Sequence, residues 1–224
     1  MKVAITLPIS INKKVVGTCF VAGANEKYTA LITALHLIDT GNDIFIGLPP
    51  HGGDISKPQL YPLTNIPAID AKLGITEPLL DLAIVLVDRN KFFAPSPNYV
   101  KNINEIKVGE EVVIVGYPFA PMGSFLETAD ISRVSAIGNR LGPIAQNRFE
   151  LIISHQTHFG SSGSPVVRRI DGSVCGIIRG CLAPPSALSL GNIPLGTDSS
   201  VTYATFTEHI PDLLNEAYSM GDLL

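Results

Sequence analysis

The chain of 224 residues is 46% hydrophobic and 16% charged, which supplies ample apolar material for a buried core. This length suits one all-β barrel protein or two lobes of about 100 residues each. A formal net charge of −4 argues against a nucleic-acid-binding surface, which needs clustered Lys and Arg. No run of eighteen apolar residues occurs, so no membrane span is expected.

Short apolar runs separated by turn signals recur along the chain. From Val3 to Ile11, apolar residues alternate with smaller or polar ones, as they do in a half-buried strand. Further runs rich in Val, Ile and Thr lie at 15–22, 28–35, 43–48, 81–87, 110–117, 126–137, 151–156, 164–170, 173–180 and 201–206. Many short strands at fairly regular spacing predict a sandwich or a barrel, so the expected fold class is all-β.

Only the last segment predicts a helix. Leu213, Leu214 and Ala217 are spaced to form one apolar face. Thr207 is the expected N-cap, and Pro211 is tolerated because it falls in the first turn.

The stretch 89–104, which contains Pro95, Pro97 and several Asn residues, is the best candidate for a linker. We therefore expect an N-terminal lobe over residues 1–95, a C-terminal lobe over 96–206 and a helix over 207–224, which together make one domain.

The cysteines and the N-terminal residues give an indication of the cellular compartment. Cys19, Cys175 and Cys181 are odd in number, which weighs against a disulfide framework and favours reduced thiols. Cys19 and Cys175 fall in apolar strands, where buried, inert thiols are expected. The N-terminal residues lack the order of a signal peptide, so a cytoplasmic location is expected. A mature form that had lost its signal peptide would look the same.

The strongest local signal for chemistry is the run GSSGSP (160–165) before an apolar strand. A serine nucleophile needs an exposed turn, and glycines on both sides of Ser162 permit one. The backbone N–H groups of Gly160 and Ser162 could then stabilise an oxyanion. Taken alone, a turn rich in Gly and Ser is more often only a loop.

Two further residues suit the same chemistry. His36 ends the run TALH and could act as a general base, although a half-buried histidine at a strand end is the commoner case. Asp81 heads the apolar run DLAIVLV, where a carboxylate needs a partner such as a histidine N–H. An exposed turn aspartate is the alternative. The chain order His, Asp, Ser is the one used on paired β-barrels.

These three motifs resemble those of the trypsin-like serine peptidases. Similarity to the HtrA-type branch extends to VGEEVVIVGYPF (108–119), ADISRVSAIG (129–138) and DGSVCGIIRG (171–180), and covers roughly residues 14 to 217. The resemblance implies two six-stranded β-barrels with a C-terminal helix, forming one peptidase domain. It also implies a catalytic triad of His36, Asp81 and Ser162.

The chain departs from the family pattern at several points. Ser161 replaces the usual Asp or Asn, and Ser164 replaces a Gly, as in glutamyl endopeptidases. The loop 157–161 therefore lacks its usual anchor, and ordering of that loop by a partner stays open. Few residues follow position 217, so the PDZ domain usual in HtrA-type proteins is not expected.

The resemblance also implies an S1 pocket. Its expected walls are Gln156, Thr157, His158, Phe159, Ile178, Arg179, Gly180, Tyr203 and Thr205. Gln156 stands at the pocket base where trypsin-like specificity requires Asp, so cleavage after Lys or Arg is disfavoured. Thr157, with positive character from His158 and Arg179, favours a polar or acidic P1 residue. The alternative is that Arg179 points to solvent and the pocket takes small aliphatic residues.

The predicted function is a serine endopeptidase that acts on proteins or peptides through an acyl-enzyme on Ser162. A catalytically inactive peptide-binding pseudopeptidase and an esterase or transferase with the same nucleophile are the alternatives. No His/Cys cluster has zinc-ligand spacing and no phosphate-binding loop occurs, so neither a metal nor a cofactor is expected. A homo-oligomer or a regulatory partner is left open.

Overall fold

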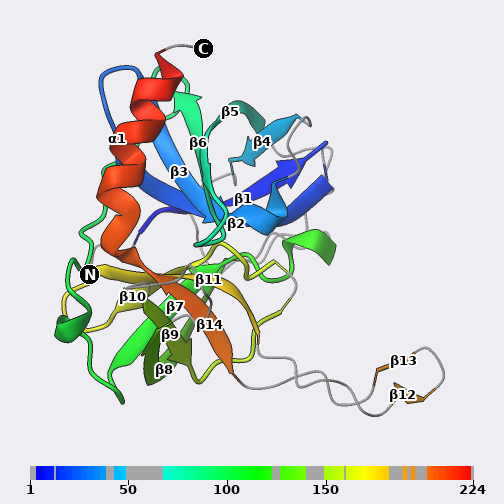
Figure 1. Ribbon diagram of the computed structural model, residues 1–224. Coiled ribbons are helices and arrows are strands. Elements are labelled where there is room, and N and C mark those ends of the chain that lie inside the picture. The colour runs from blue at the N-terminus through cyan, green and yellow to red at the C-terminus, as the bar shows by residue number, and fades with distance from the viewer. Residues whose placement is uncertain are drawn as a thin grey trace.

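Two closed antiparallel β-barrels make up the body of the protein (Figure 1). The computed structural model describes residues 4–12, 14–38, 43–48, 68–122, 127–139, 149–158, 160–181, 189–190, 193–194 and 201–222. Within this part of the chain the two-barrel fold with one C-terminal helix, expected from the sequence, is confirmed.

The first barrel has the strand order β1-β2-β3-β6-β5-β4 and closes where β1 pairs with β4. Its strands are β1 (Thr6–Ile11), β2 (Lys14–Ala24), β3 (Tyr28–Ala34), β4 (Ile44–Gly47), β5 (Ala68–Glu77) and β6 (Leu82–Asp88). A short 3-10 helix, η1 (Leu35–Leu37), follows β3.

The second barrel has the order β10-β11-β14-β9-β8-β7. Its strands are β7 (Glu111–Gly116), β8 (Thr128–Asn139), β9 (Phe149–Ile153), β10 (Pro165–Arg168), β11 (Val174–Cys181) and β14 (Thr202–Phe206). The remaining elements are η3 (Ile103–Glu105), η4 (Ala120–Met122), β12 (Ser189–Leu190), β13 (Ile193–Pro194), η5 (Thr207–His209) and α1 (Ile210–Gly221).

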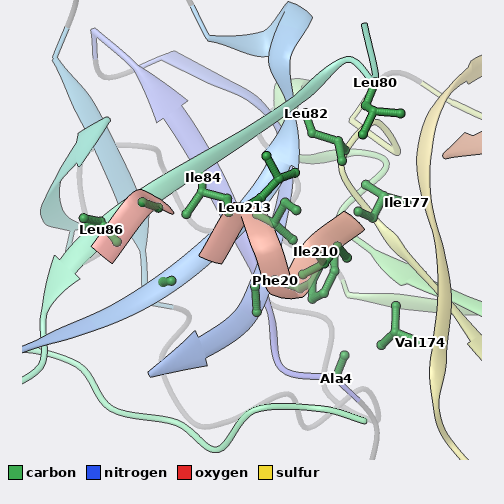
Figure 2. Packing of buried hydrophobic residues seen from close by; sticks show 14 of the residues in the cluster. Ala4, Phe20, Leu80, Leu82, Ile84, Leu86, Val174, Ile177, Ile210 and Leu213 are labelled. Carbon is green, nitrogen blue, oxygen red and sulfur yellow. The ribbon is translucent and has the colours of Figure 1, made fainter. Parts of the chain in front are cut away.

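Strand β6 explains why the run DLAIVLV is continuously apolar. Successive side chains of a strand point to opposite faces. Ala83, Val85 and Val87 enter the interior of the first barrel. Leu82, Ile84 and Leu86 instead join a second core against helix α1 and the second barrel (Figure 2). Both faces of β6 are therefore buried from Leu82 to Val87, and the one polar residue of the strand, Asp88, lies at its exposed end.

This second core joins the two barrels and the helix. Figure 2 shows Leu80 of the first barrel beside Ile177 of the second, and Phe20 beside Ile210 of α1, all in one cluster with Leu213. Since α1 covers the outer face of β5 and β6, it stabilises the first barrel although it follows the second in sequence (Figure 1).

The helix begins later than expected, and the prediction that Thr207 is its N-cap is wrong. The residue in the cap position is His209, which makes no side-chain capping hydrogen bond. Thr207 is fully buried, and its hydroxyl donates to the carbonyl of Val100 at 2.9 Å. A tertiary contact therefore takes the hydroxyl that would otherwise cap the helix.

The segment from the end of β6 to the start of β7, which includes η3, connects the barrels and packs on both. Val100 N–H donates to Val174 O at 2.9 Å, and Val174 N–H donates to Asn98 O at 2.8 Å. The Tyr99 hydroxyl donates to Ala22 O of the first barrel at 2.7 Å. The connection therefore ties the barrels together.

The structure contains no helix, among the residues it describes, with the length and apolar character needed to cross a membrane.

Candidate active site

The structure brings His36, Asp81 and Ser162 together from three separate segments. His36 lies in η1 directly after β3, Asp81 immediately precedes β6, and Ser162 lies in the turn between β9 and β10. His36 Nδ1 lies 2.8 Å from Asp81 Oδ2, and His36 Nε2 lies 3.1 Å from Ser162 Oγ. The imidazole therefore bridges the carboxylate and the hydroxyl within hydrogen-bond distance of both.

The backbone around Asp81 fixes the carboxylate beside the imidazole. Asp81 has a φ of 57°, in the left-handed region that Asp and Asn adopt more readily than most residues. Its carbonyl accepts the N–H of Leu35 at 2.9 Å, and its Oδ1 accepts the N–H of His36 at 2.9 Å. With Oδ2 facing Nδ1, the neutral imidazole carries its proton on Nδ1 and leaves Nε2 as an acceptor toward Ser162.

The charge of Asp81 is stabilised despite its partial burial. Desolvation by burial raises the pKa of the Asp81 carboxyl. The hydrogen bonds from the side chain and backbone of His36, together with the charges of His36 and Arg179, outweigh burial and hold the pKa below its usual value. The carboxyl is therefore ionised at neutral pH.

Glycines shape the turn around Ser162. Gly160 has a φ of +100° and Gly163 a φ of +85°. A Cβ on Gly163 would lie 1.9 Å from the Thr18 carbonyl oxygen, and one on Gly160 would lie 2.5 Å from that of Tyr117. The turn therefore requires glycine at both positions, for space as well as for backbone angle.

Strand β2 of the first barrel holds this turn in place. The N–H of Thr18 donates to Ser162 O at 3.0 Å, and the Thr18 hydroxyl donates to Gly160 O at 2.8 Å. The same hydroxyl accepts the N–H of Tyr117 at 2.9 Å. In the described part of the chain, the N–H groups of Gly160 and Ser162 have no hydrogen-bond acceptor of their own.

Ser161, at the position where the family usually has Asp or Asn, anchors the loop locally. Its hydroxyl accepts the N–H of His158 at 3.2 Å, and its N–H donates to His158 O at 3.0 Å. The His158 ring lies 5.6 Å from that of Phe119 between centroids. These contacts connect His158 to Ser161 and to Phe119.

Arg179 lies against the same group of side chains. Its carbonyl oxygen is 3.2 Å from Ser162 Oγ, and its Nε is 3.4 Å from Asp81 Oδ2. Its guanidinium also forms an ion pair with Glu150 on β9. The guanidinium is thus directed at Asp81 and Glu150, a placement that differs both from a pocket wall and from the solvent-facing alternative.

The other residues expected to form an S1 pocket are placed as follows. Gln156, Thr157 and His158 are exposed or half-buried between β9 and the Ser162 turn. Gly180 of β11 and Tyr203 of β14 are half-buried neighbours in the sheet. Phe159 lies outside the described residues.

Two of these residues direct their side chains elsewhere. Ile178 is fully buried in the core of the second barrel. The Thr205 hydroxyl donates to Leu80 O of the first barrel at 2.8 Å. Only the main chain of either residue is therefore free to contribute to a pocket.

Sequence reasoning missed two residues that contact this site, Glu150 and Thr18. A carboxylate inside the apolar strand FELII needs a buried partner just as Asp81 does, so the signal for Glu150 was present. Thr18 gave no such signal, because threonine is ordinary in a strand.

The cysteines lie apart from this chemistry. Cys19 and Cys175 are buried free thiols, as expected, and burial raises the pKa of Cys175 to about 12. Cys181 is exposed at the end of β11. Among the described residues, no group of His, Cys, Asp and Glu side chains could hold a metal ion.

Comparison with solved structures shows the same fold. The Rv3671c protease from M. tuberculosis, in its active form, superposes with a TM-score of 0.64 at 19% identity over 96% of this chain and 81% of that one. The HtrA-type protease AlgW with tripeptide gives a TM-score of 0.68 at 17% identity over 97% of this chain. The serine endoprotease from Yersinia pestis gives 0.63 at 18% identity over 97% of this chain.

The chain spans 61% of the AlgW chain and 64% of the Yersinia protease chain, so these similarities concern the barrels they share. No curated protein matches the chain in sequence. The family model for the trypsin-like peptidase domain matches residues 17–177, well over half of the chain and inclusive of His36, Asp81 and Ser162. The chain therefore belongs to the trypsin-like peptidase family, as its two barrels and its serine, histidine and aspartate motifs together indicate.

Proposed function

We propose that this protein is a serine endopeptidase that hydrolyses peptide bonds through an acyl-enzyme on Ser162. The observation that carries the proposal is the imidazole of His36, 2.8 Å from Asp81 on one side and 3.1 Å from Ser162 on the other. Nucleophile, base and orienting carboxylate thus have the mutual geometry that this chemistry needs.

In the first half of the reaction, Ser162 Oγ attacks the scissile carbonyl carbon while its proton passes to His36 Nε2. Asp81 stabilises the imidazolium that forms and holds its ring in place. The N–H groups of Gly160 and Ser162 donate to the oxyanion of the tetrahedral intermediate. The peptide C–N bond then breaks, and the leaving amine takes the proton from His36.

In the second half, water replaces the amine. His36 accepts a proton from water as the oxygen attacks the acyl carbon, and the same two N–H groups donate to the second oxyanion. Collapse of this intermediate releases the carboxylic acid and returns the proton from His36 to Ser162 Oγ.

The proposed specificity is for a polar or acidic P1 residue. Gln156, Thr157 and His158 form an exposed to half-buried polar segment just before the Ser162 turn. Because the Arg179 guanidinium is bound to Asp81 and Glu150, the proposal assigns the contact with P1 to Thr157 and His158 of this segment. A peptide-library cleavage profile tests this, and a profile dominated by small aliphatic P1 residues would contradict it.

A fluorophosphonate probe tests the nucleophile directly. We expect the wild-type protein to be labelled and Ser162→Ala not to be. Ser164→Ala is the matched control, because the Ser164 hydroxyl is buried without a hydrogen-bond partner among the described residues. That variant should keep its labelling.

The same experiment separates the alternatives. A folded wild-type protein that binds peptide but resists the probe would indicate a peptide-binding pseudopeptidase. Labelling accompanied by turnover of ester but not amide substrates would indicate an esterase.

A further inference from the structure

Arg179 contacts the Ser162–His36–Asp81 group at both of its ends. Its main-chain carbonyl lies 3.2 Å from Ser162 Oγ, and its guanidinium Nε lies 3.4 Å from Asp81 Oδ2. The second contact is long for a hydrogen bond but close for an ion pair. One residue of β11 thus touches both the nucleophile and the carboxylate.

The sheet register explains why this side chain reaches the first barrel. Thr205 of β14 pairs with Ile177 on β11 and with Glu150 on β9, and side chains directly opposite one another share a face. The Thr205 hydroxyl bonds Leu80 of the first barrel, so this face is the one between the barrels. A register shift between Ile178 and Gly180 leaves Arg179 without a paired residue on β14, and its contacts with Asp81 and Glu150 place its guanidinium on this same side.

The three charged groups at this point are mutually dependent. The side chains of Asp81, Arg179 and Glu150 are each only 18% exposed. A cation that is largely buried needs anionic partners, and the guanidinium lies between two carboxylates. Asp81 Oδ2 in turn faces both the guanidinium and the imidazole of His36.

We propose that Arg179, held by Glu150, is a positioning residue that orients the Asp81 carboxylate and moderates its charge toward His36. This inference rests on the proposed function, because the orientation of Asp81 affects hydrolysis only if His36 is the catalytic base. The expected effect of Arg179 on protonation of His36 does not depend on turnover.

The sign of the effect follows from the charges. Among the described residues, the charged or titratable groups that face Arg179 are Asp81 before β6, Glu150 on β9 and His36 in η1. A cation beside Asp81 disfavours a second positive charge on His36. Removing that cation should therefore let His36 accept its proton at higher pH. Neutralising Glu150 removes one of the two carboxylates that offset the positive charge of Arg179. His36 should then accept its proton only at lower pH.

The test is an NMR titration of the His36 imidazole, assigned by its loss in His36→Gln. In Arg179→Met, which keeps length but removes charge, we expect the titration midpoint to rise. In Glu150→Gln we expect it to fall. Arg179→Lys, which restores the charge, should return the midpoint toward that of the wild type. The acidic limb of the kcat/KM profile should move in the same directions.

Arg169→Met is the matched control. Arg169 is an exposed arginine that pairs with Glu111 on the second barrel, so its removal should leave the midpoint unchanged. Midpoints unchanged, or shifted in the same direction, in folded Arg179→Met and Glu150→Gln would overturn the inference. If Arg179→Met does not fold, the isosteric Glu150→Gln and the charge-conserving Arg179→Lys decide the matter.

The titration needs no turnover, so failure of the proposed function is recognised separately. A wild-type protein that resists the fluorophosphonate probe overturns the function, while the opposite shifts of the two variants still test the positioning role.

Discussion

Asp81 has an unusual backbone conformation, and this conformation places its carboxylate against His36. The left-handed φ of 57° turns the chain sharply before β6 and lets both carboxylate oxygens face His36, one toward the backbone N–H and one toward the ring. Asp and Asn tolerate this conformation where most residues do not. Asparagine is therefore the substitution that changes the charge with the least change in backbone.

We expect Asp81→Asn to lower kcat by about 10⁴-fold, because the amide no longer selects the tautomer with the proton on Nδ1. Hydrolysis of a peptide substrate measures the effect. Asp88→Asn is the matched control, since Asp88 is exposed at the far end of the same strand. Equal activity of Asp81→Asn and wild type would contradict the assigned role.

The lowered pKa of Asp81 also predicts a pH dependence of folding stability. Since the pKa is lower in the folded state, the stability it contributes is fully present above the ordinary value of 3.8 and is lost as pH falls through the folded-state value. The difference in the free energy of unfolding between wild type and Asp81→Asn should therefore shrink from pH 6 to pH 3. Urea unfolding at both pH values measures it, and a constant difference would contradict the prediction.

At the scale of elements, the expected strands match the observed ones wherever apolar residues dominate, and β5 (Ala68–Glu77) was missed. Its residues are exposed or half-buried except Gly74, and it includes Asp, Lys and Gly, which are uncommon in strands. Backbone pairing with β4 and β6 holds it in the barrel. Ile69, Ala71 and Leu73 nevertheless alternate with exposed Asp70 and Lys72 and pack against the core of the first barrel. A register shift between Leu73 and Ile75 interrupts this alternation, so only a short apolar pattern was present to recognise.

Among the glycines that the structure describes, Gly163 in the turn around Ser162 has the shortest contact for an added Cβ, 1.9 Å to the Thr18 carbonyl oxygen. We expect Gly163→Ala to destabilise the fold by about 1–3 kcal/mol from backbone strain, with the clash against Thr18 adding to this. Probe labelling should also be lost, since the turn must move. Gly138→Ala in β8 is the control, because nothing lies within 4 Å of its added Cβ. Chemical unfolding compares them, and equal stability of the two variants would contradict the prediction.

At the scale of the whole molecule, the nucleophile of one barrel depends on the other barrel. Thr18 of β2 bonds Gly160, Ser162 and, through Tyr117, the end of β7. The shared core around Phe20, Leu82 and Ile177 adds apolar burial to the same interface. The site is therefore built by docking of the two barrels.

Thr18→Val tests this dependence. The isosteric change leaves the N–H of Tyr117 and the carbonyl of Gly160 without the hydroxyl, at a cost of about 1–3 kcal/mol for each unsatisfied group. We expect lower stability and slower probe labelling. Thr18→Ser keeps the hydroxyl and should label at nearly the wild-type rate, whereas equally slow labelling of both variants would point to loss of packing instead.

The sequence by itself determined the all-β class, most strands, the C-terminal helical segment and the three motifs around His36, Asp81 and Ser162. These follow from local causes: side-chain alternation, turn residues and the placement of single polar groups in apolar runs. The tertiary structure decided that Thr207 bonds Val100, that β5 pairs between β4 and β6 and that Arg179 faces Asp81 and Glu150. Each of these depends on strand register and on packing between segments far apart in the chain. The pattern of residues along one segment does not specify which face of one strand packs against which face of another.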